Sequence, residues 1–468
     1  MTQPVLICSN PPHWRVAVIG SGPSGFYAVG ELLKQKEMPV KVDLFDRLPT
    51  PYGLVRGGVA PDHQNIKRVA KSYDRLLKTE NIRFIGNVTL GTDIQVSELE
   101  ERYHVVMYAT GNEAARKLNI PGEDLNGVHS ATEFVFWYNG HPDYCTRQFS
   151  LQDGKRIAII GNGNVSIDVA RIIAKRPDKL AETDIAEYAL AGLKKCPVEE
   201  VLLLGRRGPA QSAFSPKEIE ELAALDGSDL TVLHKDIEQS NQPHNLKWLE
   251  NDAPPTAQKN MDFLREQVKF GEGEKDRKIR CCFYVSPTEF LGKDGRLTHM
   301  RLQRNQLVEK NGRLSARSTG EEWLEEVQLV FKAIGYRGIP IPGVPFDDWR
   351  GIIPNVEGRV IDLESNEHKR GHYVVGWAKR GPTGLIGTNR SDAEDTVEIL
   401  LKDVNELSQR EIQANDILEL LSARGVRTVD SNDWFVLDQE ELRRGKEKEK
   451  VRDKFTSVEA MLQFLDQQ

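Results

Sequence analysis

The chain has 468 residues, of which 39% are hydrophobic and 28% charged, and a formal net charge of −7. This length predicts two or three domains that each bury a core, in an ordinary globular composition. The acidic balance argues against a general binder of nucleic acid or membrane surfaces, and no apolar run approaches the roughly 20 residues of a membrane helix.

The cysteines and the start of the chain bear on its compartment. The cysteines are odd in number and scattered, no C-x-x-C motif occurs, and the adjacent pair is geometrically poor for a disulfide. Residues 1–14 show no signal-peptide or transit-peptide pattern, so no targeting segment is visible. We therefore expect reduced thiols in a cytoplasmic protein. The cysteines are Cys8, Cys145, Cys196, Cys281 and Cys282.

The first chemical signal is a glycine-rich turn. Residues 16–19 form an apolar, β-branched run typical of a buried parallel strand, and Gly20, Gly22 and Gly25 follow on the G-x-G-x-x-G spacing. In that motif the glycines permit a tight turn, close approach to a pyrophosphate and close packing of helix on strand. The diphosphate then lies at the N-terminus of the helix, where free N–H groups favour negative charge.

An acid at the end of the next strand completes the pattern. The predicted strand 42–45 ends in Asp46, whose carboxylate can accept hydrogen bonds from a ribose. This order of strand, turn, helix, strand and acid indicates a dinucleotide site and not an ordinary glycine turn. Residues 48–63 are too rich in Pro and Gly for regular structure, and a long irregular segment here is more often functional than idle.

The remainder of the first unit shows the hydrophobic patterns of helices and strands. Residues 65–78 predict one helix, and 82–88 and 104–111 predict strands. The second of these strands ends in a glycine turn, so we expect the chain to cross into another domain near Asn112.

A second fingerprint opens the next unit. Residues 156–160 are an apolar strand that leads into Gly161 and Gly163 and a helix over 165–174, with Ser166 at the third small position. Its following strand, 201–204, comes late because residues 177–197 form a partly helical insertion.

The residues after strand 201–204 differ from those of the first unit. Instead of an acid, the chain has Gly205-Arg206-Arg207-Gly208. Two guanidiniums at this position favour a nucleotide with a 2′-phosphate, which predicts NADP(H).

The remaining segments complete the two units. An acidic helix is predicted over 216–225, and residues 227–278 are polar and carry little chemistry. A return crossing is expected at 334–338. Residues 372–389 combine a strand with a glycine-rich loop that leads into a helix, whose positive end can stabilise a reduced flavin. Further strands are predicted at 281–289, 297–307 and 326–334, a helix at 392–401, and a polar helical tail at 407–468.

Two dinucleotide units in one chain predict FAD in the outer domain and a pyridine nucleotide in the inner one, with hydride passing between their rings. Disulfide reductases of this kind need a redox cysteine pair, which is absent, and nothing indicates an oxygenation pocket. By elimination we expect one-electron delivery to a separate carrier. The predicted fold class is α/β, with residues 113–335 as the NADP(H) domain inserted in an FAD domain made of 1–112 and 336–468.

Four long motifs resemble the adrenodoxin reductase family of ferredoxin–NADP(+) reductases, which are glutathione-reductase-like flavoproteins. The motifs are residues 48–63, 161–165, 205–209 and 376–389, and the resemblance covers the whole chain. It implies non-covalent FAD, NADPH as donor and a ferredoxin-type iron–sulfur protein as acceptor.

The resemblance also implies site residues. His63 and Glu221 match residues that assist hydride transfer or proton balance, although His63 could equally hold its loop and Glu221 could be solvated. FAD contacts carried over are Ser24, Asp46, Leu54, Val88, Trp377, Gly384, Leu385 and Ile386, beside Gly20, Gly22 and Gly25. NADP(H) contacts carried over are Arg116, Asn162, Gly163, Asn164, Val165, Arg206, Arg207, Glu218 and Gly384.

Three positions depart from the family pattern without affecting the cofactor prediction. Asp46 stands where Glu is usual, Ser166 where Ala is common, and Gln64 where Pro is common. Some relatives carry a ferredoxin module, but this chain has no such cysteine run, so a separate acceptor is expected. Two other classes remain open: an electron-transferring subunit of a larger complex, like the reductase part of a glutamate synthase, or an NADPH diaphorase or sensor with another acceptor.

Overall fold

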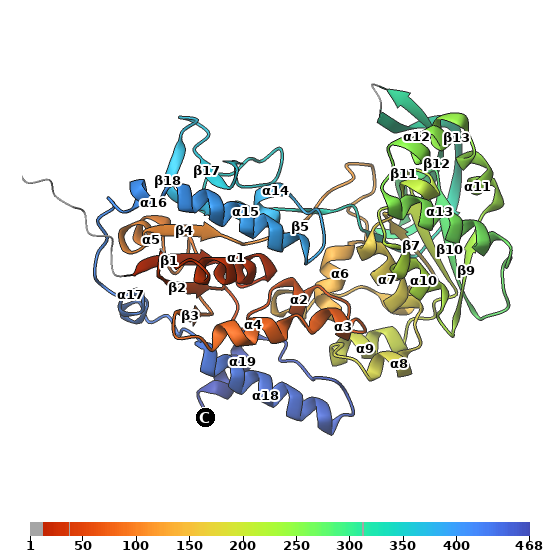
Figure 1. The fold of residues 1–468 in the computed structure, drawn as a ribbon. Coiled ribbons are helices and arrows are strands. Elements are labelled where there is room, and N and C mark those ends of the chain that lie inside the picture. Colours follow the sequence, from red (N-terminus) through yellow and green to blue (C-terminus); the bar gives the residue numbers. More distant parts are fainter. Residues whose placement is uncertain (1–12, 37, 311–312) are drawn as a thin grey trace, which may run out of the picture.

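The computed structural model describes residues 13–36, 38–310 and 313–468 and has two domains side by side (Figure 1). The first domain is built on a sheet with the strand order β16-β17-β18-β4-β1-β2-β3. Strands β18, β4, β1, β2 and β3 are parallel, and β17 and β16 add an antiparallel edge. Its strands are β1 Trp14–Ile19, β2 Val40–Phe45, β3 Ile82–Ile85, β4 Val105–Tyr108, β16 Asn355–Val356, β17 Arg359–Ile361 and β18 His368–Val374.

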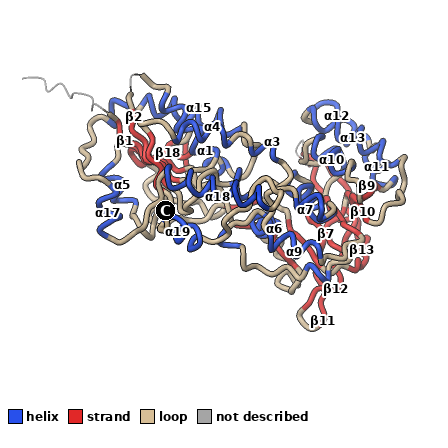
Figure 2. The backbone as a smooth tube through the Cα atoms, turned by 90° about the horizontal axis from the view of Figure 1, so that it is seen from below, coloured by secondary structure: helices blue, strands red, loops and turns tan. Residues whose placement is uncertain are grey.

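The second domain contains a wholly parallel sheet with the order β6-β14-β7-β8-β10-β9. An antiparallel meander, β11-β12-β13, packs beside it. Figure 2 shows the strands of the two domains at opposite ends of an elongated molecule. The strands are β6 Val128–Ser130, β7 Arg156–Ile160, β8 Glu200–Gly205, β9 Ser228–Val232, β10 Arg277–Phe283, β11 Val285–Lys293, β12 Arg296–Lys310, β13 Arg313–Glu326 and β14 Leu329–Lys332.

Helices cover both sheets, because each helix has an apolar face that can be buried against a sheet. Phe26, Val29 and Leu32 of α1 are buried at helical spacing against the first sheet. The first domain holds α1 Pro23–Leu33, α2 Leu54–Gly57, α3 Gln64–Lys67, α4 Ala70–Leu77, α5 Val96–Arg102, α14 Trp377–Arg380, α15 Thr388–Lys402, α16 Val404–Leu407, α17 Ile417–Ala423, α18 Ser431–Glu447 and α19 Val458–Leu465. The second holds α6 Ala131–Tyr138, α7 Asn164–Ala174, α8 Pro177–Ala181, α9 Glu187–Lys194, α10 Pro216–Ala223, α11 His234–Ser240, α12 Pro243–Asn251 and α13 Pro255–Val268.

The chain passes between the domains at two points that lie next to each other. The outgoing strand β5 (Ala114–Ala115) pairs antiparallel with the returning strand β15 (Tyr336–Arg337). Gly111 and Gly335, at φ values of +68° and +104°, flank this short ladder. The two chain crossings are therefore joined by a β-ladder of two residue pairs, flanked by glycines.

The predicted fold class, two dinucleotide-binding folds with one inserted in the other, is confirmed. Several details differ from the sequence-based expectation. Residues 48–63, expected to lack regular structure, contain the short helix α2. The helix expected over 65–78 is two helices, α3 and α4, and Ile66 is exposed. Strand β13 was not predicted, because its charged sequence pairs along the exposed meander. The polar segment 227–278 forms β9 and three helices and buries Asp236 completely.

None of the described helices is both long and apolar enough to cross a membrane.

Candidate functional site

The turn between β1 and α1 forms a cradle of backbone N–H groups. At Gly20, with φ of +108°, a Cβ would lie 2.5 Å from the Ala109 carbonyl oxygen, and at Gly25 a Cβ would overlap the Gly20 carbonyl. Both positions therefore exclude a side chain. Gly22 has open space, with the Gly53 Cα 3.9 Å from where its Cβ would be, and no side chain caps the start of α1. These N–H groups are available to a phosphate.

Asp46 directly follows β2, beside this cradle. Its Oδ2 accepts hydrogen bonds from the Ser21 backbone at 3.0 Å and hydroxyl at 2.5 Å, and its Oδ1 accepts one from the Leu48 N–H at 3.0 Å. Val88 is adjacent, since its N–H donates to the Asp46 carbonyl at 2.9 Å. The carboxylate thus lies at the edge of the cradle and is held there by two backbone N–H groups and the Ser21 hydroxyl.

The loop after β18 packs against the start of α1. Gly376, at φ of +73°, comes so close to Ser24 that a Cβ would overlap the serine hydroxyl. Trp377 follows; its indole N–H donates to the Thr383 carbonyl at 3.1 Å, and its ring centroid lies 5.4 Å from that of Tyr336. Two segments far apart in sequence, the glycine turn and the 376–389 loop, therefore form one site.

The other residues predicted for this site vary in exposure. Leu54 begins α2 directly after Gly53 and is half-buried, as is Ile386. Gly384 has φ of +80°, and Leu385 is 65% exposed. In the same loop, the Nε and Nη1 atoms of Arg380 are buried without a hydrogen-bond partner among the described residues. Such donors, together with the open cradle, fit an anionic dinucleotide such as FAD.

A second cradle follows β7. Gly161, at φ of +141°, faces the Ala333 carbonyl so closely that a Cβ would overlap it, whereas no described atom lies within 4 Å of a Cβ at Gly163. Ser166 is fully buried and donates from Oγ to the Gly163 carbonyl at 2.5 Å. Ser166 stands where Ala is common, and its hydroxyl thus has a hydrogen-bond partner within the turn.

The residues after the first glycine are held by the second domain itself. The Asn162 carbonyl accepts from the Ala213 N–H at 2.7 Å, and Asn164 Oδ1 accepts from the Ser215 N–H at 2.8 Å. Val165 packs on the second-domain core. The backbone around Gly163 is therefore rigid and open on one side.

Arg206 and Arg207 follow β8 and are exposed. Neither forms an ion pair with any described residue. Partial desolvation of its guanidinium and the neighbouring Arg206 lower the pKa of Arg207. Arg116, directly after β5, is also exposed, and its Nε donates to the Tyr336 carbonyl at 3.2 Å. Unpaired guanidiniums next to an open cradle fit a nucleotide with an additional phosphate.

The two domains meet at His63, the residue before α3. Its Nε2 lies 3.0 Å from Glu221 Oε2 and 3.7 Å from Glu218 Oε2, both on α10. Its Nδ1 lies 3.6 Å from Asp168 Oδ1 and 3.3 Å from Arg171 Nη2, both on α7. Burial and Asp168 raise the pKa of Glu218. The structure therefore brings together His63, Glu218 and Glu221, which are far apart in the sequence.

Arg171 organises this cluster, and only 3% of its side chain is exposed. It binds Asp62 through Nε at 2.9 Å and Nη2 at 3.0 Å, and Asp168 through Nη2 at 2.7 Å. Its Nη2 also lies 3.3 Å from His63 Nδ1. The imidazole is thus held between Glu221 on α10 and the Arg171–Asp168 pair on α7.

No sequence motif singled out Asp62, Asp168 and Arg171 as site residues. The available signal was the pair Asp168 and Arg171 on the otherwise apolar helix α7, since charged residues are rarely buried unless paired. A cleft of about 520 Å³ opens beside the cluster and is lined by residues of both domains, among them His63 and Glu221.

The cysteines lie apart from this cluster. The described ones, Cys145, Cys196, Cys281 and Cys282, are free thiols, and Cys8 is outside the described residues. Burial raises the pKa of Cys196 to about 11 and that of Cys282 to about 12. These thiols are poor candidates for a reactive thiolate.

Two nucleotide cradles joined at a charged interface define a dinucleotide-dependent oxidoreductase of the two-domain flavoprotein class. A sequence model of the pyridine nucleotide-disulphide oxidoreductases matches residues 14–223. The chain is 42% identical to NADPH-ferredoxin reductase FprA of Mycobacterium tuberculosis, over 96% of this chain and 99% of that protein. It is 40% identical to the mitochondrial NADPH:adrenodoxin oxidoreductase of Arabidopsis thaliana, over 97% and 95% of the two chains.

A solved structure, Mycobacterium tuberculosis FprA in complex with NADPH, matches with a TM-score of 0.89 at 41% identity, covering 97% of this chain and 99% of that one. The protein therefore belongs to the adrenodoxin reductase family of ferredoxin–NADP(+) reductases.

Proposed function

We propose that this protein is an NADPH–ferredoxin oxidoreductase that oxidises NADPH and reduces a separate iron–sulfur protein of the ferredoxin or adrenodoxin type. The observation that carries the choice of donor is the exposed pair Arg206 and Arg207 after β8, which has no carboxylate partner among the described residues. Family membership, shown by relatives of about 40% identity over nearly the whole chain, supports the choice of acceptor.

In this proposal the first domain holds FAD without a covalent bond. The diphosphate lies on the N–H groups around Gly22, and the ribose lies at Asp46. When bound, FAD accepts a hydride from NADPH and passes the electrons on one at a time. The proposed FAD contacts are Gly20, Gly22, Ser24, Gly25, Asp46, Leu54, Val88, Trp377, Gly384, Leu385 and Ile386.

The second domain holds NADP(H). Arg206 and Arg207 bind the 2′-phosphate by charge-assisted hydrogen bonds, and the backbone at Gly163 approaches the pyrophosphate. The proposed contacts are Arg116, Asn162, Gly163, Asn164, Val165, Arg206, Arg207, Glu218 and Gly384. We assign residues 113–335 to this domain and residues 1–112 and 336–468 to the FAD domain, an assignment supported by the β5–β15 ladder.

His63 and Glu221 are proposed to work as a pair at the domain interface. Their 3.0 Å contact holds the second domain against the loop that follows the FAD cradle. Arg171 orients the imidazole, and the surrounding carboxylates can hold a proton near the reacting groups. We further propose that the protein acts in the cytoplasm.

Purification with spectroscopy and steady-state assays tests the proposal. We expect a yellow protein that releases intact FAD on denaturation, prefers NADPH to NADH, and reduces cytochrome c only when a host ferredoxin is added. A folded but colourless protein that takes up no FAD would refute the proposal. If NADPH reduced dyes while every host ferredoxin failed, the acceptor would be of another kind.

A further inference from the structure

The C-terminal region contains an unusual concentration of buried charge. Residues 448–457, which we call the strap, connect α18 to α19 and run against both domains (Figure 1). The helices on either side belong to the first domain, because Trp434, Leu437 and Met461 lie in its core. The strap itself reaches the second domain: the Val451 N–H donates to the Glu182 carbonyl at 3.2 Å.

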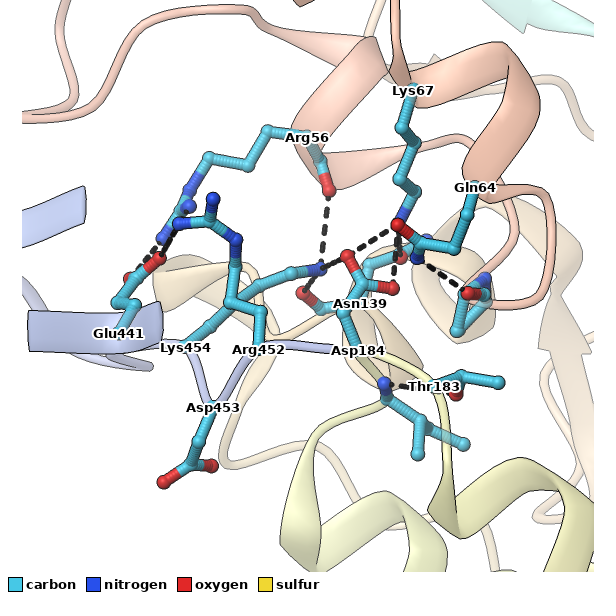
Figure 3. Close-up of polar contacts among 12 residues, drawn as sticks. Arg56, Gln64, Lys67, Asn139, Thr183, Asp184, Glu441, Arg452, Asp453 and Lys454 are labelled. Atoms are coloured by element: carbon cyan, nitrogen blue, oxygen red, sulfur yellow. Dashed lines mark hydrogen bonds and ion pairs between the residues drawn. The ribbon is translucent and has the colours of Figure 1, made fainter. Parts of the chain in front are cut away.

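Lys454 is the centre of this contact. Only 3% of its side chain is exposed, and each N–H of its ammonium has an acceptor. The acceptors are the Asn139 carbonyl at 2.9 Å, the Arg56 carbonyl at 3.3 Å and the Asp184 carboxylate at 3.2 Å (Figure 3). Arg56 belongs to the first domain, and Asn139 and Asp184 to the second. One buried ammonium therefore joins both domains to the C-terminal strap.

A second lysine converges on the same carboxylate. Lys67, at the end of α3, donates to both oxygens of Asp184, at 2.8 Å and 2.7 Å, and to Asn139 Oδ1 at 3.3 Å. Burial would raise the pKa of Asp184, but Lys454 and Lys67 lower it to about 2. The carboxylate is thus ionised and bound from two sides. We call Lys67, Asp184 and Lys454 the lysine clasp.

The clasp is connected to the candidate site through a single short helix. His63 precedes α3 and contacts Glu221 of the second domain, while Lys67 ends α3 and contacts Asp184. The α3 helix is therefore attached to the second domain at both of its ends. Among the described residues, the covalent links between the domains are the chain crossings at β5 and β15, next to glycines that permit hinge motion.

We propose that Lys454 is a positioning residue: through Asp184 and Lys67 it holds α3, and with it His63, in a fixed orientation toward the second domain. The two nucleotide domains then remain apposed during NADPH oxidation without rotating at the chain crossings. The kinetic part of this inference rests on the proposed function, whereas the structural part does not.

The test compares Lys454→Met and Asp184→Asn with Lys448→Met in the full-length holoenzyme. Lys448 is the control on the same strap, because its half-exposed ammonium pairs with Asp453 at 2.8 Å, within the C-terminal region. Hydrogen exchange is followed in residues 63–68 and at the two crossings. Flavin reduction at saturating NADPH is measured by stopped flow, beside the Kd of NADP+.

For both clasp variants we expect exchange in these segments to rise about tenfold. Flavin reduction should slow about tenfold while the Kd of NADP+ changes less than about twofold, because each domain keeps its own site and loses only the mutual orientation. Lys448→Met should match the wild type. Unchanged exchange at residues 63–68, or equal effects of all three substitutions, would overturn the proposal. The exchange result stands even if no host ferredoxin is reduced, so the failure of the proposed function would be recognised separately.

Discussion

The imidazole Nε2 of His63 lies 3.0 Å from Oε2 of Glu221, and this contact crosses from one nucleotide-binding domain to the other. Its two residues are 158 positions apart in the sequence and belong to different domains, so only the docking of the domains brings them together. Asp168 and Arg171 approach the other ring nitrogen, which leaves His63 enclosed by second-domain side chains.

If the pair acts as a unit, its substitutions should be non-additive. We expect His63→Gln and Glu221→Gln each to slow flavin reduction by NADPH about threefold to tenfold, and the double variant to be no slower than the worse single one. Stopped-flow absorbance measures these rates. Glu220→Gln, on the exposed side of the same helix, should have no effect. Additive losses would mean that the two residues act independently.

The arginine pair should decide the nucleotide preference. Arg206→Ala or Arg207→Ala is expected to raise the KM for NADPH at least about tenfold, because each removes charge-assisted hydrogen bonds to the 2′-phosphate worth roughly 1.5–3 kcal/mol. The KM for NADH should barely change. Arg265→Ala, a partly exposed arginine on α13, serves as the control. Equal losses with both nucleotides would assign these arginines to fold stability.

Glu441 provides a prediction on pH and stability. Its side chain is fully buried, and although burial acts to raise its pKa, Arg56 and Arg452 bring the pKa down from 4.5 to about 2. A depressed carboxyl pKa contributes stability above the unfolded value, and this contribution is lost as pH falls through the folded value.

Glu441→Gln should therefore lower the free energy of unfolding by at most roughly 3 kcal/mol at pH 7. This difference should shrink as the pH falls from about 4.5 to about 2. Denaturant titrations at a series of pH values measure it. A difference that does not depend on pH would show that the effect comes from packing instead of charge.

Electron transfer from NADPH to ferredoxin should not require the cysteines. Replacing all five cysteines with Ser or Ala is expected to leave ferredoxin-dependent cytochrome c reduction within about threefold of wild type, a barrier change below roughly 1 kcal/mol. The reason is that the described cysteines are free thiols, with Cys196 and Cys281 buried, and that no dithiol need store electrons. Loss of flavin reoxidation in a folded variant would instead indicate a dithiol intermediate.

Much of the fold could be predicted from local sequence. Gly20 and Gly161 mark backbone conformations and close approaches that a side chain would block, so the two cradles can be recognised from a few consecutive residues. The parallel strands of both sheets can also be recognised locally, because they are short apolar runs. The single helix expected over 65–78 was wrong, since its amphipathic period continues across the break between α3 and α4.

The sequence alone determined the class of the two nucleotide folds and the arginine pair Arg206–Arg207, because each depends on a few consecutive residues. The order of the motifs along the chain indicated that one fold is inserted in the other. Only the tertiary structure decided which charges are buried and with which partners. Lys454 stands in a tail whose charged residues resemble any solvated surface, and its partner Asp184 is distant in sequence. A buried ion pair is stable only when both charges and their hydrogen bonds meet in space, and no local pattern encodes that meeting.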